Sequence, residues 1–314
     1  MKTLKQLAGV GLLSVAMLQS AWAQEPESCK MVRFAEIGWA DIAATTGVAM
    51  TLSEGLGYQT RKIMASVPIA FTGVQKGQID VFLGYWAPSM DAVIEPFTKD
   101  GGVKVLPKAN LEGAKYTLAV PTYAAEAGLK SFADIAKFKD QLGGKIFAIE
   151  PGNDGNLLIE GMIKSNQFGL GDFKMIESSE AGMLVQLQRA VKKNEPAVFL
   201  GWAPHPMNTQ FDITYLEGGD DVFGPNFGAA QVYTVVPPDY EARCANVGKL
   251  LNNLQFTVEI ESQLMEKVLD KQNPTDVAKE WIKANPAILD QWLAGVTTYD
   301  GQDGVAAVKK HLGL

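Results

Sequence analysis

The sequence predicts an α/β protein of two lobes, each a mostly parallel sheet flanked by helices, with two crossings of the chain between the lobes. Helical and strand patterns alternate along most of the chain, which is typical of parallel strands joined by crossover helices. Two apolar β runs that end in proline, residues 116–121 and 230–238, interrupt this alternation and are the predicted crossings. In addition, a strand pattern with a tryptophan at its end, residues 81–90, recurs at residues 198–207.

The expected elements follow the alternation in order. In the first lobe we expect strands at residues 32–37, 58–64, 79–84 and 103–106, and helices at residues 41–54, 67–76 and 91–98. In the second lobe we expect a helix capped by Ser131, strands at residues 144–149, 173–177, 198–202 and 212–216, and helices at residues 157–166 and 179–193.

From residue 243 onward the pattern is helical. Asn273-Pro274 and Asn285-Pro286 each have the pattern of a helix start, with Asn as the cap and Pro in the first turn. We interpret Trp281 and Trp292, which lie in these helices, as structural residues. The predicted lobes are residues 24–117 with 237–314, and residues 118–236.

The repeated pattern is a short apolar run that ends in Gly, Trp and Ala-Pro. It reads Val81-Phe-Leu-Gly-Tyr-Trp86-Ala-Pro in the first copy and Val198-Phe-Leu-Gly-Trp202-Ala-Pro in the second. Such a run is typical of a buried strand, and open α/β sheets bind ligands at the carboxyl ends of their strands. Trp86 and Trp202 are therefore candidates to face one cleft, although a tryptophan in an apolar strand is more often a core residue. The repeat is imperfect, because Tyr85 has no counterpart before Trp202.

The N-terminus has the pattern of an export signal. A basic start, the apolar residues 7–18 and Ala21-Trp22-Ala23 predict cleavage after Ala23 and an exported protein. No other stretch approaches the roughly 18 apolar residues of a membrane-spanning helix. The remainder, of roughly 290 residues, is long enough for two domains.

Composition narrows the range of partners. The chain has 47% hydrophobic and 20% charged residues and a net charge of −7. This acidic balance argues against nucleic acids and anionic membrane surfaces, and mildly favours a cationic ligand. The two cysteines, Cys29 and Cys244, predict one disulfide in an exported protein, with two buried free thiols as the alternative. The disulfide would return the C-terminal part of the chain to the first lobe.

Residues for catalysis are scarce. His205 and His311 are not in a metal-ligand spacing, and the chain has neither a Gly-x-Ser-x-Gly elbow nor a phosphate-binding loop. We therefore expect no catalytic residues, no metal site, no cofactor and no enzyme activity. His205, which lies between two prolines, is interpreted as a turn residue.

The strand ends instead offer aromatic side chains. Trp39, Trp86 and Trp202 are candidates, with Tyr116 as a further one. Aromatic faces attract a quaternary ammonium, which carries charge but donates no hydrogen bond, at on the order of 1–2 kcal/mol for each desolvated contact. Four such contacts are comparable with the roughly 8 kcal/mol of micromolar binding. An aromatic cleft could also stack a sugar, so the polar groups of the cleft must distinguish between a sugar and a quaternary ammonium as ligand.

Two polar residues are candidates to make that choice. Asp41 begins a predicted helix, and is either its N-cap, a ligand contact, or both. Asn153 lies in a Gly-Asn-Asp-Gly loop before another helix and has the same two interpretations. A carboxylate in the cleft favours an alcohol over a carboxylate ligand, because choline's hydroxyl can donate to Asp41 whereas betaine's carboxylate is repelled.

At these residues the sequence resembles the periplasmic substrate-binding proteins of quaternary-amine ABC transporters, and among them the choline-binding members. The resemblance covers essentially the whole chain after the signal, the Asn-Pro helices included. The motifs that carry it are Gly38-Trp39-Ala40-Asp41, Gly84-Tyr85-Trp86-Ala87-Pro88, Lys115-Tyr116-Thr117-Leu118-Ala119-Val120-Pro121, Pro151-Gly152-Asn153-Asp154-Gly155 and Gly201-Trp202-Ala203-Pro204.

The resemblance implies a type II binding-protein clamshell whose aromatic box encloses a trimethylammonium group. The box would consist of Trp39, Trp86, Tyr116 and Trp202, and Asp41 and Asn153 would bind the hydroxyl end. It also suggests the Cys29–Cys244 disulfide.

We therefore expect a periplasmic, monomeric protein that binds choline, with weaker binding of acetylcholine or betaine. It would deliver choline to a membrane permease driven by a cytoplasmic ATPase, and closure of the lobes would complete the box. A glycine betaine or carnitine binder is the alternative within this class. A two-lobe enzyme and a ligand-sensing subunit are the alternatives outside it.

Overall fold

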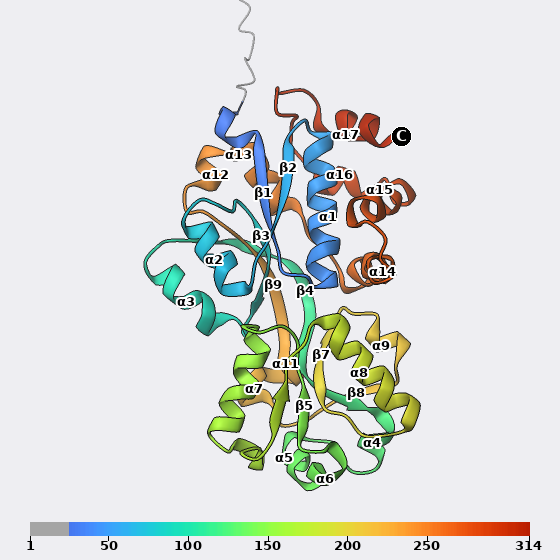
Figure 1. Cartoon of the computed structure of the whole chain (residues 1–314). Helices are drawn as coiled ribbons and strands as arrows, with labels where there is room; N and C mark the ends of the chain where they lie inside the picture. Colours follow the sequence, from blue (N-terminus) through green and yellow to red (C-terminus); the bar gives the residue numbers. More distant parts are fainter. Residues whose placement is uncertain (1–24) are drawn as a thin grey trace, which may run out of the picture.

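The computed structural model describes residues 25–314, and two halves of the molecule are joined by a pair of long strands (Figure 1). These strands are β4 (Lys104–Pro121) and β9 (Ala229–Val236), which pair antiparallel and continue from the upper half into the lower half. They contain the two β runs that the sequence marks as crossings. The predicted export signal, residues 1–23, lies outside the described residues.

The upper half begins with a parallel pair, β1 (Met31–Glu36) and β2 (Gln59–Met64). A parallel bridge between Phe34 and Val81 joins β1 to the start of β3 (Phe82–Ala87), which then pairs antiparallel with β9. The other elements of this half are the turn η1 (Glu27–Cys29) and the helices α1 (Ala40–Gly55), α2 (Val67–Gln75) and α3 (Asp91–Lys99).

The C-terminal helices return to this upper half, where several of them cover α1 (Figure 1). In α1, a Cβ at Gly47 would lie 2.6 Å from the Pro274 carbonyl oxygen, so glycine permits the close approach of the helix that Pro274 begins. The helices of this part are α12 (Tyr240–Arg243), α13 (Ala245–Asn253), α14 (Val258–Leu269), α15 (Pro274–Ala284), α16 (Ile288–Trp292) and α17 (Gly304–Leu312).

In the lower half, parallel and antiparallel strands share one sheet. Its order, with the two long strands and β3, is β3-β9-β4-β7-β5-β6, and β8 pairs with β4. The strand β5 is parallel to both of its neighbours, as predicted, whereas β7 and β8 are antiparallel to β4. The strands of this half are β5 (Lys145–Phe147), β6 (Lys174–Ile176), β7 (Phe199–Ala203) and β8 (Ile213–Tyr215).

Short helices surround this sheet, and two longer ones cover it (Figure 1). The capping box predicted at Ser131 is confirmed, with Asp134 as its partner. The helices are α4 (Thr122–Glu126), α5 (Phe132–Ile135), η2 (Ala136–Phe138), α6 (Lys139–Leu142), α7 (Asp154–Lys164), η3 (Gln167–Gly169), α8 (Glu180–Lys193), α9 (Met207–Gln210), α10 (Asp220–Phe223) and α11 (Pro225–Gly228).

Two predicted details are wrong. The short strand expected at residues 103–106 is the beginning of the 18-residue β4, whose register shifts against β9 let it continue. Asn285 does not begin a helix: its side chain donates to the Trp281 carbonyl at 2.9 Å and closes α15, so α16 begins only after Ala287. Asn273, in contrast, caps α15 as predicted, with its side chain accepting from the Thr275 N–H at 3.0 Å.

The predicted disulfide is confirmed. Cys29 and Cys244 are bonded, with their Cα atoms 5.5 Å apart, and join η1 to the junction between α12 and α13. Trp281 and Trp292 stack on each other at 6.0 Å in the C-terminal helices, in keeping with structural roles. Within residues 25–314, no helix combines the length and apolar character needed to span a membrane.

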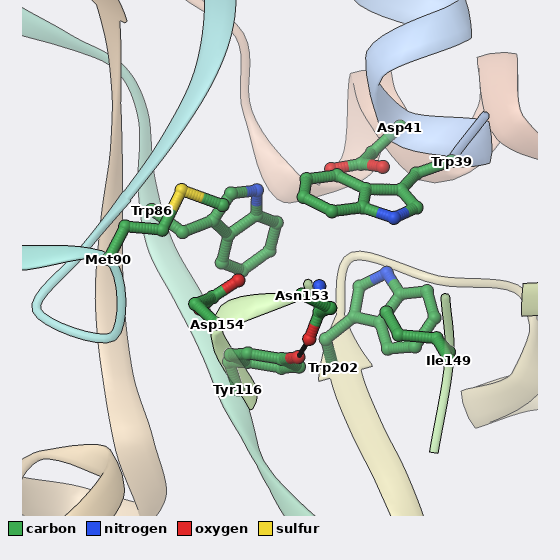
Figure 2. Close-up of a pocket in the computed structure, with 9 residues that line it drawn as sticks. All are labelled: Trp39, Asp41, Trp86, Met90, Tyr116, Ile149, Asn153, Asp154 and Trp202. Atoms are coloured by element: carbon green, nitrogen blue, oxygen red, sulfur yellow. Dashed lines mark hydrogen bonds between the residues drawn. The ribbon is translucent and has the colours of Figure 1, made fainter. Parts of the chain in front are cut away.

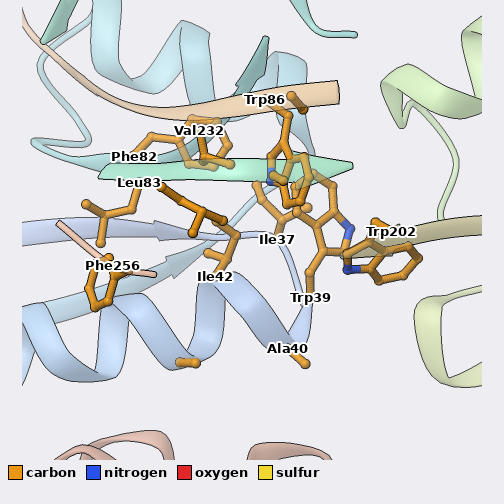
Figure 3. Packing of buried hydrophobic residues seen from close by; sticks show 14 of the residues in the cluster. Ile37, Trp39, Ala40, Ile42, Phe82, Leu83, Trp86, Trp202, Val232 and Phe256 are labelled. Carbon is orange, nitrogen blue, oxygen red and sulfur yellow. The ribbon is translucent and has the colours of Figure 1, made fainter. Parts of the chain in front are cut away.

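The buried apolar core extends from the helices and strands of the upper half to the ends of the strands that carry the tryptophans. Figure 3 shows Ile42 of α1 and Leu83 of β3 packed together, and the same cluster continues to Trp39, Trp86 and Trp202. The three tryptophans therefore lie where the hydrophobic core reaches the space between the two halves.

Candidate ligand-binding site

A pocket lies between the two halves, and all six residues predicted to bind ligand line it (Figure 2). The four aromatic residues come from four elements, so chain folding and not local sequence brings them together. Three further residues that the sequence did not single out complete the lining. The nine residues are Trp39, Asp41, Trp86, Met90, Tyr116, Ile149, Asn153, Asp154 and Trp202.

The aromatic rings form adjoining walls. Tyr116 and Trp202 are paired across the β4–β7 ladder, and their ring centroids are 6.3 Å apart at an angle of 80°. On the other side of Tyr116, the Trp86 ring is 6.0 Å away. Trp39 precedes α1 and faces the same space from the upper half (Figure 2). All four rings are almost fully buried, which strengthens any cation–π contact made there.

A β-bulge explains how both copies of the repeat direct a tryptophan to this pocket. Against β9, Phe82 pairs with Val235 and Tyr85 with Tyr233, so two residues of β3 face one of β9. Side chains alternate between the two faces along a strand, so the additional residue Tyr85 alone would direct Trp86 to the face away from the pocket. The bulge shifts the alternation by one residue and returns Trp86 to the pocket face. In β7, which lacks the additional residue, the pairing with β4 runs without a shift.

Asn153 caps a helix, as one of its two interpretations predicts, and it also lines the pocket. It is the N-cap of α7, with its side-chain oxygen accepting from the Asn156 N–H at 3.2 Å, and it also accepts from the Tyr116 hydroxyl at 2.8 Å. Its amide also acts on Glu150, because a hydrogen bond from the Asn153 side chain lowers the pKa of that carboxyl. Asn153 thus fixes the Tyr116 ring and offers a polar contact in the same pocket.

Asp41 is not an N-cap, because α1 begins at Ala40 and Trp39 holds the cap position. The Asp41 side chain is 3% exposed, and its Oδ1 has no hydrogen-bond partner within residues 25–314. Burial raises the pKa of Asp41 to about 7, and the nearby carboxylate of Glu180 acts in the same direction. A carboxyl group in this state gains from a ligand that brings a hydrogen-bond donor or a positive charge.

Behind the tryptophans lies a group of buried contacts that the sequence did not reveal. The Trp39 Nε1–H donates to Glu150 at 2.9 Å, and the Ala40 N–H donates to Glu180 Oε2 at 2.8 Å. Both contacts join the upper half to the lower half. Burial raises the pKa of Glu150, while the hydrogen bond from Trp39 opposes that rise.

The interpretation of His205 as a turn residue is corrected by its burial and contacts. Its ring lies 4.7 Å from Trp202, and its Nδ1 accepts from the Met207 N–H at 2.8 Å. The ring proton is therefore on Nε2, which donates to Glu180 Oε1 at 2.8 Å. His205 positions Glu180, and through it the start of α1.

Among residues 25–314 there is no group of three or more His, Cys, Asp or Glu side chains arranged to hold a metal ion. None of the residues that line the pocket is a lysine or arginine. The arrangement is therefore an aromatic pocket with two carboxyl groups, suited to enclosing a small cation.

Comparisons with known proteins agree with this geometry. Residues 30–284 match the family model OpuAC, the substrate-binding domain of ABC-type glycine betaine transport systems. The fold is that of type II periplasmic binding proteins, which confirms the predicted fold class.

Individual proteins are also similar to this chain in sequence or in structure. An ABC-transporter choline-binding protein solved in complex with choline is 53% identical, with a TM-score of 0.90, over 92% of this chain and 100% of that chain. The lactococcal OpuAC, solved closed with glycine betaine, is 26% identical with a TM-score of 0.76, over 84% of this chain and 99% of that one. An uncharacterized protein, ORF1 of Chromohalobacter salexigens, is 50% identical over 139 residues, which cover 44% of this chain and 87% of that protein.

Proposed function

The chain belongs to the family of substrate-binding domains of ABC-type glycine betaine transport systems, and from this premise we propose that it binds choline for uptake. The observation that carries the proposal is the convergence of four aromatic rings with two carboxyl groups and no basic side chain in one pocket. Such a pocket stabilises a trimethylammonium group on its aromatic faces. Similarity to a protein solved with choline supports the same ligand.

We propose that the hydroxyl of choline binds between Asp41 and Asn153. Asp41 accepts a hydrogen bond from the hydroxyl, and the amide nitrogen of Asn153 donates to the hydroxyl oxygen. Glycine betaine and carnitine are the alternative ligands, favoured by the family description and by the relative solved with glycine betaine. Their carboxylates would lie against Asp41, which is why we place them second.

Residues 24–117 with 237–314 and residues 118–236 are the proposed lobes, with the hinge in β4 and β9. Closure would bring Trp39 and Trp86 of one lobe to Trp202 of the other, and Tyr116 lies at the hinge. The hydrogen bonds from Trp39 to Glu150 and from Ala40 to Glu180 cross between these segments. They support an assignment of this conformation as closed.

We further propose that the protein acts in the periplasm as a monomer without enzyme activity. Its partner would be a membrane permease driven by a cytoplasmic ATPase, to which the closed form delivers choline. A turnover assay on a choline ester tests the enzyme alternative, and the absence of a cognate permease would favour a sensing role.

Titration of the purified protein with choline, glycine betaine and carnitine, followed by tryptophan fluorescence, tests the proposed ligand. We expect micromolar or tighter binding of choline and weaker binding of the other two. Betaine that binds as tightly as choline would contradict the role of Asp41.

The box is tested with Trp202→Ala, for which we expect a loss of about 100-fold in choline affinity from the lost cation–π contact and burial. Trp281→Leu is the matched control, because it removes a tryptophan outside the pocket. Full choline affinity in the Trp202 variant would refute the box.

A further inference from the structure

Asp154 is a second acidic side chain in the pocket, and its position is unusual for a carboxylate. It is the first residue of α7, directly after Asn153, and its side chain is only 1% exposed. Neither of its carboxyl oxygens has a hydrogen-bond partner within residues 25–314. The hydroxyl of the nearby Ser89 donates to the Trp86 carbonyl at 3.2 Å.

Among the described residues that line the pocket, none is a lysine or arginine that could balance the charge of Asp154. Burial raises its pKa to about 6, and Glu150 raises it further, while Ser89 and the first amides of α7 act against this. A buried carboxylate without a partner is costly, and it either takes up a proton or gains from a cation that enters the pocket. The cation that would balance Asp154 must therefore come with the ligand.

The two pocket carboxyl groups lie in different places. Figure 2 shows Asp41 beside Trp39 at the start of α1, whereas Asp154 reaches from α7 toward the ring of Trp86. The charge of Asp154 also raises the pKa of Tyr116, although burial of that ring is the larger cause. Asp154 is thus next to two walls of the aromatic box, Trp86 and Tyr116.

We infer that Asp154 is a specificity-determining residue that pairs electrostatically with the quaternary ammonium and disfavours ligands that also carry a carboxylate. This inference rests on the proposed function and deepens it. Asp41 takes the hydroxyl of the ligand, and Asp154 balances its positive charge. A quaternary ammonium donates no hydrogen bond, so a carboxylate without a hydrogen-bonding partner is well matched to it.

Three ligands separate these roles at pH 8, where both carboxyl groups are ionised in the wild type. Tetramethylammonium has the charge alone, choline has the charge and a hydroxyl, and glycine betaine has the charge and a carboxylate. For Asp154→Asn we expect tetramethylammonium and choline to weaken by the same factor, on the order of tenfold or more. The affinity for glycine betaine should change much less. The variant loses the attraction of Asp154 for the ammonium group of betaine, but it also loses the repulsion between Asp154 and the carboxylate of betaine. The choline-to-betaine preference should fall at least about fivefold.

Three further variants make the comparison specific. Asp41→Asn should weaken choline more than tetramethylammonium. Asp140→Asn, on the exposed surface of α6 at the far end of the lower half, removes the same charge and should leave all three affinities unchanged. Asp154→Ser, smaller and also neutral, is measured in parallel and should give the same ratios as Asp154→Asn. Calorimetry gives the affinities, and the melting temperature shows that each variant is folded.

The outcomes distinguish the inference from the function on which it rests. Wild-type protein that binds none of the three ligands would overturn the proposed function. Wild-type protein that prefers choline, with both Asp154 variants keeping the same preference within twofold, would overturn the role of Asp154 alone. A loss confined to choline, with tetramethylammonium unchanged, would also overturn it, because the carboxylate would then serve the hydroxyl.

Discussion

The two Trp–Ala–Pro junctions of this protein share a local sequence and differ in the residues after the proline. At the end of β3, Ala87-Pro88 leads to Ser89 and Met90, and Met90 lines the pocket. At the end of β7, Ala203-Pro204 leads to His205, which lies behind Trp202 and binds Glu180. Both Ala-Pro bonds are cis. The first junction therefore extends the pocket wall, and the second connects its tryptophan to a contact between the two halves.

This difference shows that one local pattern can serve two tasks. The repeat places an aromatic ring at a strand end in both halves. For this task the tryptophan must lie on the face of the strand that is directed to the pocket. The residues after the proline decide whether the junction contacts the pocket or the opposite half. Variants that act on one junction only can separate the two tasks.

The largest effect is expected from deletion of Tyr85. With the bulge at Leu83 and Gly84 kept, the deletion moves Trp86 to the position of Tyr85 opposite Tyr233, where its ring faces away from the pocket. We expect choline affinity to fall by about 100-fold or more while β7 is unaffected. Fluorescence titration gives the affinity, and circular dichroism shows whether the fold persists.

Tyr85→Ala is the matched control for this deletion, because it keeps the number of residues in β3. It removes the hydrogen bond from Tyr85 to Asp91 and the ring contact with Tyr233, both outside the pocket. Its choline affinity should stay within about threefold of the wild type. Equal losses in the deletion and in Tyr85→Ala would contradict the role of the bulge.

The second junction is tested through Glu180. In Glu180→Ala the Ala40 N–H and His205 lose their shared acceptor, so the contact between the halves weakens. We expect choline to dissociate about tenfold faster, with a smaller change in the association rate. Stopped-flow fluorescence measures both rates.

Glu180→Gln keeps an oxygen that can accept from the Ala40 N–H. Its rate of choline dissociation should lie between those of the wild type and Glu180→Ala. The comparison variant in the first junction is Ser89→Ala, whose hydroxyl donates to the Trp86 carbonyl at 3.2 Å. It should change dissociation less than about threefold. If Ser89→Ala matched Glu180→Ala, the two junctions would not have distinct tasks.

A smaller effect is expected from pH, since each half contributes to the pocket lining one carboxyl group with a raised pKa. The pKa of Asp41 is about 7 and that of Asp154 about 6, in both cases mainly through burial. Glu180 and Glu261 face Asp41, and Glu150 and Tyr116 face Asp154. As pH rises from 5.5 to 8 both groups ionise, and choline affinity should rise by about tenfold, as calorimetry at several pH values can show.

Stability without ligand should change in the opposite direction. In the folded protein these carboxyl groups hold their protons more tightly than in the unfolded chain, where an aspartate has a pKa near 3.9. Their contribution to stability is therefore greatest below about pH 4 and is lost as pH rises through 6 to 7. Asp41→Asn and Asp154→Asn should each flatten the fall in melting temperature over that range. Unchanged curves in both variants would contradict the raised pKa values.

The sequence predicted the features that local patterns determine. Trp39, Trp86 and Trp202 each follow an apolar strand, and the ends of such strands meet at one edge of a fold of this class. Tyr116 lies inside an apolar run, where a tyrosine is usually a core residue, so the residues alone gave it less support than the three tryptophans, and the resemblance to a family added the rest. The length of β4 was hidden because its middle is polar and contains Gly113 at a positive φ.

The residues that the sequence missed depend on contacts between distant segments. Glu180 meets Ala40 across 140 positions of the chain, and nothing in the residues around it distinguishes it from an ordinary first-turn glutamate. Asp154 follows Asn153 in the same loop, but its lack of a partner is a property of the folded pocket. Packing, and not residue type, gives these two carboxyl groups their special environment.

The Cys29–Cys244 bond makes the chain between those residues a closed ring that includes both long strands and the entire lower half. A single proteolytic cut in any loop of that ring opens it without releasing a fragment. The two pieces migrate separately in a denaturing gel only after reduction. A protease that reaches an exposed loop of the lower half therefore leaves a nicked molecule in which both halves stay covalently joined.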